Sequence, residues 1–326
     1  MRESRKSPAL SLLSAVVMTG LVVSYFFLPD SNSMHADGMV GTPWLSTLLA
    51  IVFLTAIAVS MGLLNYSSFL FTSDTKLLYL PYLIFVLSVP GSMDFGLWHI
   101  AALLTVLSMF YAAGYVNSER VRMDFVFGTV LTAGAASLMI PQLVYVQAFL
   151  FLYCFYMRGY SPFRYLLASV AGAAVPWLYL LSWSYVFPDS LIPADYLRGF
   201  RSAAALSMPE PGTMELSVMI WAGYAILLVL RSIFFVLSRN RERNKAQKNS
   251  FGLSVALSSV VILLTVFCGG LETPAFAMAA SVPVSFVVFD LFTNGSRAEV
   301  NIWMVLLLII ATVQRMSEFL PELIPF

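Results

Sequence analysis

The sequence predicts an all-α protein, folded as a polytopic bundle of about ten or eleven transmembrane helices. Of its 326 residues, 60% are hydrophobic and only 11% are charged, so polar surface is too scarce to cover a soluble globule. Long, almost uncharged stretches recur along the chain, and a helix needs about 20 apolar residues to cross the hydrocarbon core. A transmembrane β-barrel would instead show short segments of alternating polarity. We therefore expect helices throughout a single integral membrane domain, residues 1–326.

Breaks at proline and glycine divide the chain into its spans. The start MRESRK, followed by an apolar run, resembles a signal peptide, but the run is long for one and favours an uncleaved first span. The segments 125–140 and 142–157 form either two full spans or a re-entrant hairpin that turns at Pro141. The last segment either crosses the membrane or lies in its interface. The predicted spans are 10–28, 43–64, 77–91, 95–116, 125–140, 142–157, 163–187, 214–238, 253–271, 274–292 and 302–313.

The distribution of charge predicts the orientation. With a cytoplasmic N-terminus and alternating spans, all but four of the 18 lysines and arginines fall on the inner side, as the positive-inside rule requires. The exceptions are Arg231, which lies within a span, and three outer residues, Arg198, Arg201 and Arg315. Most of the acidic residues fall on the outer side. The outer face is therefore predicted to be acidic, with very few basic residues.

Two of the rare outer arginines form a candidate anion site. The segment IPADYLRGFRSAAAL is predicted to form a short helix that starts near Asp195 and places Arg198 and Arg201 on neighbouring positions of one face. Two guanidinium groups so placed are suited to binding a phosphate. The alternative is an interfacial helix whose arginines contact ordinary lipid headgroups or Asp195.

Four outer carboxylates are candidate catalytic residues. Asp30 and Asp37 lie in the first outer loop beside His35, whereas Asp94 and Glu272 lie in short turns that hold them close to the bundle. A carboxylate in such a place is suited to acid or base catalysis. His99 follows Asp94, but no histidine pair has metal-ligand spacing, so no metal site is predicted. The alternative is that these are solvated loop residues.

Ionisable residues inside the predicted spans are few. Arg231 and Asp290 both lie near inner ends, where Arg231 either snorkels to the surface or pairs with Asp290. No carboxylate or histidine falls at the midplane, which disfavours an ion-coupled transporter. It leaves open a carrier that uses uncharged polar groups, for which the candidates are Asn65, Gln142 and Gln147.

Small residues and the basic tract have structural interpretations. Gly128, Thr132 and Ala136 are four residues apart, as are Ala168 and Gly172, and this spacing favours close helix packing. The tract 239–248 is predicted to anchor the topology, or else to dock a cytoplasmic partner, and it is too short for nucleic acid. Cys154 and Cys268 lie in apolar runs and are read as packing residues without a disulfide.

The stretch 125–187 carries two resemblances. Its small-residue-rich short span, Pro turn, second short span and SPFRYLLASVAGAAVPW resemble a family of uncharacterised polytopic inner-membrane proteins of Bacteroidetes, which implies a bacterial inner-membrane location. It also resembles, more faintly, the GT-C superfamily of membrane glycosyltransferases. That resemblance implies a polyprenyl-phosphate lipid as partner, Asp30 or Asp37 as the catalytic acid, and Arg198 and Arg201 on the lipid phosphate. The first outer loop here is shorter and has no adjacent pair of acids.

Three classes of function follow from these patterns. The first is an outer-face site that handles a lipid-linked or phosphorylated envelope precursor, including by glycosyl transfer. The second is a carrier or flippase for a small molecule or lipid, and the third is a non-catalytic subunit of an envelope assembly complex. In each case the lipid bilayer is a partner, and no particular cofactor is indicated.

Overall fold

The computed structural model confirms an all-α chain. It describes residues 19, 43–68, 79–89, 92–118, 122–158, 162–187, 199–200, 216–238, 245–267 and 273–317. Within these ranges every long element is a helix. The elements are α2 (Pro43–Ser68), α3 (Tyr79–Leu87), α4 (Leu97–Asn117), α5 (Met123–Met139), the 3₁₀ turn η3 (Pro141–Leu143), α6 (Val144–Arg158), α7 (Pro162–Val186), α9 (Leu216–Ser238), α10 (Lys245–Phe267), α11 (Thr273–Asn294) and α12 (Arg297–Ser317).

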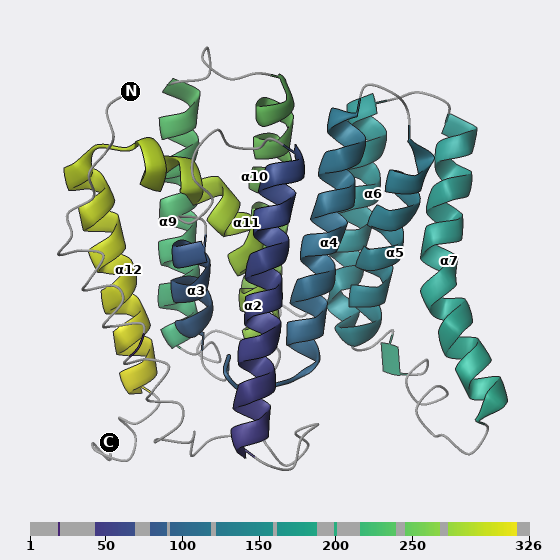
Figure 1. The fold of residues 1–326 in the computed structure, drawn as a ribbon, viewed down its shortest axis with the longest axis horizontal. Coiled ribbons are helices and arrows are strands. Elements are labelled where there is room, and N and C mark those ends of the chain that lie inside the picture. Colours follow the sequence, from purple (N-terminus) through teal and green to yellow (C-terminus); the bar gives the residue numbers. More distant parts are fainter. Residues whose placement is uncertain are drawn as a thin grey trace.

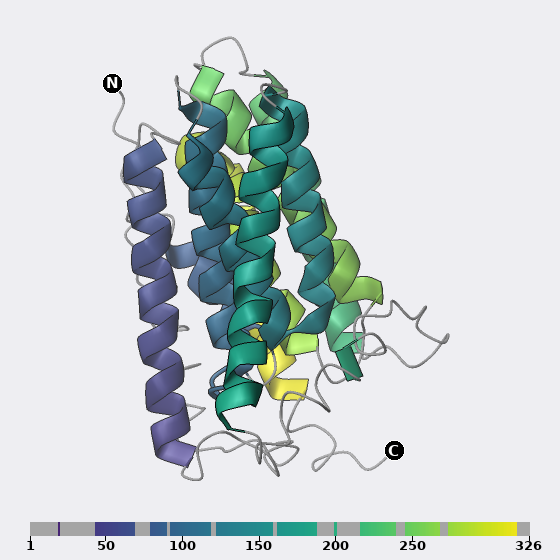
Figure 2. The same cartoon turned by 90° about the vertical axis from the view of Figure 1, so that its right-hand side faces the viewer.

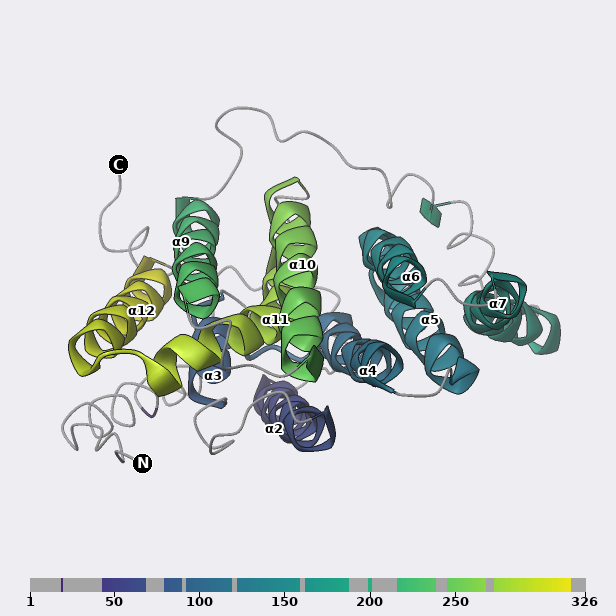
Figure 3. The ribbon, with the colours of Figure 1, turned by 90° about the horizontal axis from the view of Figure 1, so that it is seen from above.

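The helices form a multi-pass membrane bundle. Six of those in the described ranges are long and apolar enough to cross a membrane. Consecutive helices run in alternate directions, as the predicted topology requires (Figure 1). Most of their axes are roughly parallel to one another (Figure 2). Seen from above, the bundle is elongated, with α12 at one end and α7 at the other (Figure 3). The predicted span 10–28 lies outside the described residues, apart from Thr19.

Helix α11 lies at the centre of the bundle. It packs against α3, α4, α9 and α10, and every residue from Phe276 to Phe292 is buried. Ser281 and Ser285 donate to the carbonyl oxygens of Ala277 and Ser281 in the same helix. Their hydroxyl groups are therefore satisfied locally, and small side chains let the neighbouring helices approach closely. In the described ranges, protein rather than a polar channel fills the middle of the molecule.

Glycines bring α4, α5 and α7 together, as the small-residue spacing predicted. A Cβ atom added to Gly128 would lie 2.8 Å from the ring of Tyr111 on α4. A Cβ added to Gly172 would lie 2.7 Å from the backbone oxygen of Phe127 on α5. Neither position leaves room for a methyl group, so both glycines are required for these contacts. Cys154 is buried as a free cysteine, in agreement with its predicted packing role.

Several helices differ in length from the predicted spans. Helix α3 ends at Leu87, four residues before the end of the span predicted over 77–91. Helix α10 begins at Lys245, eight residues before the predicted start at 253 and inside the basic tract 239–248. Just after this tract, the side-chain amide of Asn117 on α4 donates to Ser250 Oγ at 2.6 Å. Helix α12 includes the predicted segment 302–313 but is longer, with 21 residues. It lies alongside α9 at the end of the bundle (Figures 1 and 3).

The segment 125–157 folds as a hairpin of two helices. Ile140 is extended, and Pro141 begins the short η3 turn from which α6 returns alongside α5. Proline suits this position because the first residue of a helix needs no amide donor. At the start of α5, Arg122 pairs with Asp124 at 2.6 Å, and this hydrogen bond lowers the pKa of the Asp124 carboxyl.

The two ionisable residues predicted inside spans do not pair with each other. Arg231 of α9 pairs instead with Glu299 of α12 at 2.5 Å, so the suggested pair with Asp290 is corrected. Asp290 accepts a hydrogen bond from Asn294, one turn further along α11. The ion pair therefore ties α9 to the first turn of α12.

Candidate functional site

Most of the predicted site residues lie outside the described residues, namely Asp30, His35, Asp37, Arg198, Arg201 and Glu272. The structure describes two regions that bear on them. The first is the turn between α3 and α4, which contains Asp94. The second is a groove among α5, α6 and α7, together with the segment Gly199–Phe200, which lies between the two arginines in the sequence.

The turn between α3 and α4 is held firmly against the bundle. The backbone amide of Phe95 donates to Ser46 Oγ of α2 at 2.8 Å, and its ring packs 5.0 Å from that of Phe53. Asp94 is half-buried in this turn, between residues that are anchored on either side. A carboxylate held in this way keeps a fixed position at the end of the bundle.

His99 is a buried residue of α4, not the solvated loop residue that the sequence favoured. Its side chain is 0% exposed. Nδ1 accepts a hydrogen bond from the amide of Gly96 at 3.3 Å, and Nε2 lies 3.0 Å from the carbonyl oxygen of Ser92. These two bonds require Nδ1 to be unprotonated and Nε2 to carry the proton. Both ring nitrogens are thereby used to hold the turn, which leaves neither for a metal or for proton transfer.

No metal cluster is found near this turn. In the described ranges, no group of three His, Cys, Asp or Glu side chains is placed to hold a metal ion. A carboxylate in the position of Asp94 can act as an acid, a base or an acceptor of hydrogen bonds.

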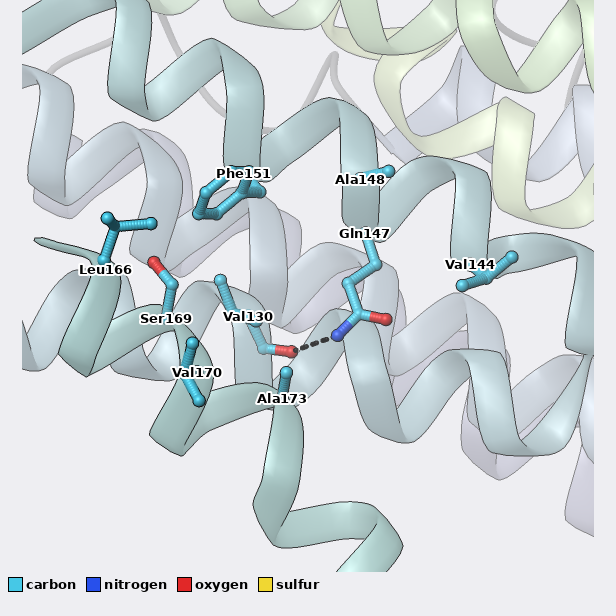
Figure 4. Close-up of a pocket in the computed structure, with 9 residues that line it drawn as sticks. All are labelled: Val130, Val144, Gln147, Ala148, Phe151, Leu166, Ser169, Val170 and Ala173. Carbon is cyan, nitrogen blue, oxygen red and sulfur yellow. Dashed lines mark hydrogen bonds between the residues drawn. The ribbon is translucent and has the colours of Figure 1, made fainter.

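The groove among α5, α6 and α7 has a volume of about 320 Å³. Figure 4 shows residues of α6 and α7 on opposite sides, with Val130 of α5 between them. Ala148, Leu166 and Val170 are exposed on its rim. Since these helices lie in the membrane bundle, the groove opens sideways towards the hydrocarbon of the bilayer. Its lining is Val130, Val144, Gln147, Ala148, Phe151, Leu166, Ser169, Val170 and Ala173.

The groove exists because α6 and α7 both pack on α5 but touch each other mainly at one end. There, Tyr165 of α7 donates to the carbonyl oxygen of Phe151 on α6 at 2.6 Å, and its ring lies 5.4 Å from that of Phe155. Gly172 holds α7 against the backbone of α5. The two helices are therefore joined beside Phe151 and are separated by the groove further along.

Two polar side chains face this otherwise apolar groove. Gln147 donates to the carbonyl oxygen of Val130 at 3.4 Å, and Figure 4 shows its amide reaching across from α6. Ser169 is only 3% exposed, and among the described residues its hydroxyl makes no hydrogen bond of good geometry, although it lies near the Tyr165 hydroxyl. Gln147 was one of the polar residues singled out from the sequence, but the groove itself was not predicted, because nothing in the local pattern shows that α6 and α7 separate.

The segment between the two arginines lies against α7. The ring of Phe200 meets the ring of Trp177 edge to face, with their centroids 4.8 Å apart. Trp177 follows Pro176, and a Cβ atom added to Gly134 would contact both Pro176 and Gln147 of the groove. The Trp177–Phe200 contact thus lies just beyond the end of the groove formed by Gln147 and Ala173. In Figure 3 the short segment 199–200 appears between α6 and α7.

In comparisons with known proteins, no family model, curated protein or solved structure matches this chain.

Proposed function

We propose that this multi-pass membrane protein resides in a bacterial inner membrane and binds a lipid-linked phosphate at its outer face. The supporting observation is the contact of Phe200 with Trp177, nine residues before the end of α7. Arg198 and Arg201 flank Phe200 in the sequence, so this contact is the described point of the bundle nearest to them along the chain. That point is in the outer half of α7 if the N-terminus is cytoplasmic.

The chemistry of the two arginines favours a phosphate ligand. Guanidinium groups bind phosphate through paired, charge-assisted hydrogen bonds. Only one other basic residue, Arg315, is predicted on the same face, so the pair stands out from an acidic surrounding. An envelope precursor carried on a lipid would supply such a phosphate.

Glycosyl transfer is the reaction that this arrangement suits best. Asp94, or one of Asp30, Asp37 and Glu272, would accept the proton of the acceptor hydroxyl. The acceptor oxygen would form its bond to the anomeric carbon, while the bond from that carbon to the phosphate oxygen breaks. The lipid phosphate would leave with the electron pair, and arginines stabilise such a leaving group. A carrier is less well supported, since α11 fills the centre of the bundle.

The arginine pair is tested by removing both charges. The double variant Arg198→Ala/Arg201→Ala is expected to bind hexadecyl phosphate about tenfold or more weakly than the wild type, because charge-assisted bonds are lost. Binding is measured on the purified full chain by native mass spectrometry. Binding of hexadecanol and of inorganic phosphate is measured in the same way. These two ligands separate the contribution of the hydrocarbon chain to the affinity from that of the phosphate.

A matched control removes two arginines from the other face. The variant Arg239→Ala/Arg241→Ala should bind hexadecyl phosphate as the wild type does. In cells, the outer double variant should reproduce the phenotype of a deletion without a fall in protein level. Unchanged binding and an unchanged phenotype for the outer double variant would exclude the phosphate site and leave a non-catalytic subunit as the better account.

A further inference from the structure

We propose that the groove among α5, α6 and α7 binds the hydrocarbon chain of a single-chain lipid phosphate. The identity of the headgroup rests on the function proposed above, whereas the chain site rests on the groove alone. A chain seated in the groove would place its phosphate beyond Ala173, next to the Trp177–Phe200 contact.

The medium around the groove favours a hydrocarbon occupant. Val130, Val144, Phe151 and Val170 give it an apolar wall on three helices. The exposed face of α7 continues this apolar surface outward, with Phe163, Leu167 and Tyr179 exposed. Water has few partners in such a place, whereas an alkyl or isoprenyl chain loses nothing on leaving the bilayer and gains packing contacts.

The size of the groove favours a chain over a helix of another protein. Its volume of about 320 Å³ lies at the low end of small-molecule sites, which span roughly 300–1,000 Å³. The Tyr165–Phe151 hydrogen bond also closes one end of the gap, so a second helix cannot lie along its full length.

The orientation of the chain follows from the position of the two ends. The closed end lies beside Phe151 and Tyr165, while the other end leads to Pro176 and Trp177. Trp177 is one turn, about 6 Å, beyond Ala173 along α7. The hydrocarbon tail would therefore point to the closed end, and the phosphate would lie near Phe200, which Arg198 and Arg201 flank in the sequence.

Photolabelling of the purified full chain tests this site. The probes are hexadecanol and hexadecyl phosphate, each with a diazirine in the middle of the chain. In the wild type, both probes should label peptides of α5, α6 and α7. Ala173→Phe narrows the groove from α7, and Ala148→Phe narrows it from α6. Each is expected to reduce labelling of these peptides by both probes about tenfold.

Ala171→Phe is the matched control. Ala171 is exposed on α7 and does not line the groove, so the same added ring should leave labelling unchanged. Folding of every variant is checked by monodisperse elution and by the melting temperature. If Ala173→Phe fails to fold, Ala148→Phe tests the same space from the opposite helix.

The outcomes for chain and headgroup are separable. Folded groove variants that are labelled like the wild type would overturn the chain site, whatever the arginine variants show. A second outcome combines loss of labelling in the groove variants with unchanged binding of hexadecyl phosphate by Arg198→Ala/Arg201→Ala. This result would support the chain site and exclude the phosphate site. Labelling that maps to other helices, or a co-purifying protein cross-linked in the groove, would also overturn the proposal.

Discussion

Ser169 differs from the other described hydroxyl residues of the groove helices. Thr129 and Ser137 on α5, and Ser182 on α7, each donate to a carbonyl oxygen of their own helix. This local bond is the usual way to satisfy a hydroxyl in a membrane helix. Ser169 is buried like Thr129 and Ser137 but makes no such bond. Among the described serines and threonines that line the groove, it therefore has a hydroxyl that its own helix does not satisfy.

We expect Ser169→Ala to raise the melting temperature of the protein. No hydrogen bond of good geometry is lost, and the cost of burying a poorly paired hydroxyl, about 1–3 kcal/mol, is removed. Ser137→Ala is the matched control, because it deletes a 2.7 Å bond to Gly134 and should lower stability by about 1 kcal/mol or less. The melting temperatures of both variants and of the wild type are measured by thermal unfolding in the same detergent. A fall for Ser169→Ala as large as that for Ser137→Ala would mean that the Ser169 hydroxyl has a partner after all.

His99 illustrates what a single residue's sequence context does not reveal. Its place after Asp94 suggested a loop residue with acid–base potential, yet both ring nitrogens bond to the backbone of the turn before α4. The bond from the Gly96 amide forms because His99 is three residues beyond that helix-capping glycine. The sequence contains this spacing, but only the folded turn shows that the second nitrogen meets Ser92.

At the scale of elements, the contact between α5 and α7 depends on Gly172. A side chain there would meet the backbone oxygen of Phe127, which cannot rotate away as a flexible side chain can. The helices would have to move apart, and the wall of the groove would move with them.

Gly172→Ala should therefore destabilise the protein, by about 1–3 kcal/mol for an overpacked site. Gly223→Ala on α9 is the matched control, because nothing lies within 4 Å of a Cβ atom added there. It should be neutral or stabilising by up to about 1 kcal/mol, since alanine favours a helix more than glycine does. Chemical or thermal unfolding of the two variants gives the comparison. Equal effects at the two positions would contradict the close contact of α5 and α7.

The limits of prediction at this scale concern length and neighbours. The sequence placed α4, α7 and α9 within two residues of their ends, because proline and polar residues mark those ends. It placed the end of α3 four residues too late, because the apolar run continues past Leu87 into the turn. It underestimated α12, which begins at Arg297, and the pair of Glu299 with Arg231 stabilises a charge in that first turn.

At the scale of the whole molecule, sidedness decides where the proposed chemistry takes place. The alternation of helices in Figure 1 places the start of α10, with Lys245 and Lys248, at the opposite end of the bundle from the end of α7. The basic tract is thus on the other side from the proposed phosphate site.

Reporter fusions test this arrangement. Alkaline phosphatase fused after Ala203 should be active, because that position is predicted outside, and inactive after Gln247. A fluorescent protein that matures only in the cytoplasm should give the reverse pattern. Phosphatase activity after Gln247 together with fluorescence after Ala203 would show the opposite orientation in the membrane. The arginine pair would then lie on the cytoplasmic face.

The sequence by itself determined that the chain is helical and crosses the membrane several times. Backbone polar groups have no other partners in lipid, so long apolar runs must satisfy them within helices. It also identified Gly128 and Gly172 as contact points, because spacing alone brings small residues to one face.

Only the tertiary structure decided which helices are neighbours. These spans are apolar on nearly all sides, and lipid is as apolar as the protein interior, so a helix's own pattern does not show which face is buried. The central position of α11, the pairing of Arg231 with Glu299 and the groove between α6 and α7 all follow from how side chains distant in sequence fit together.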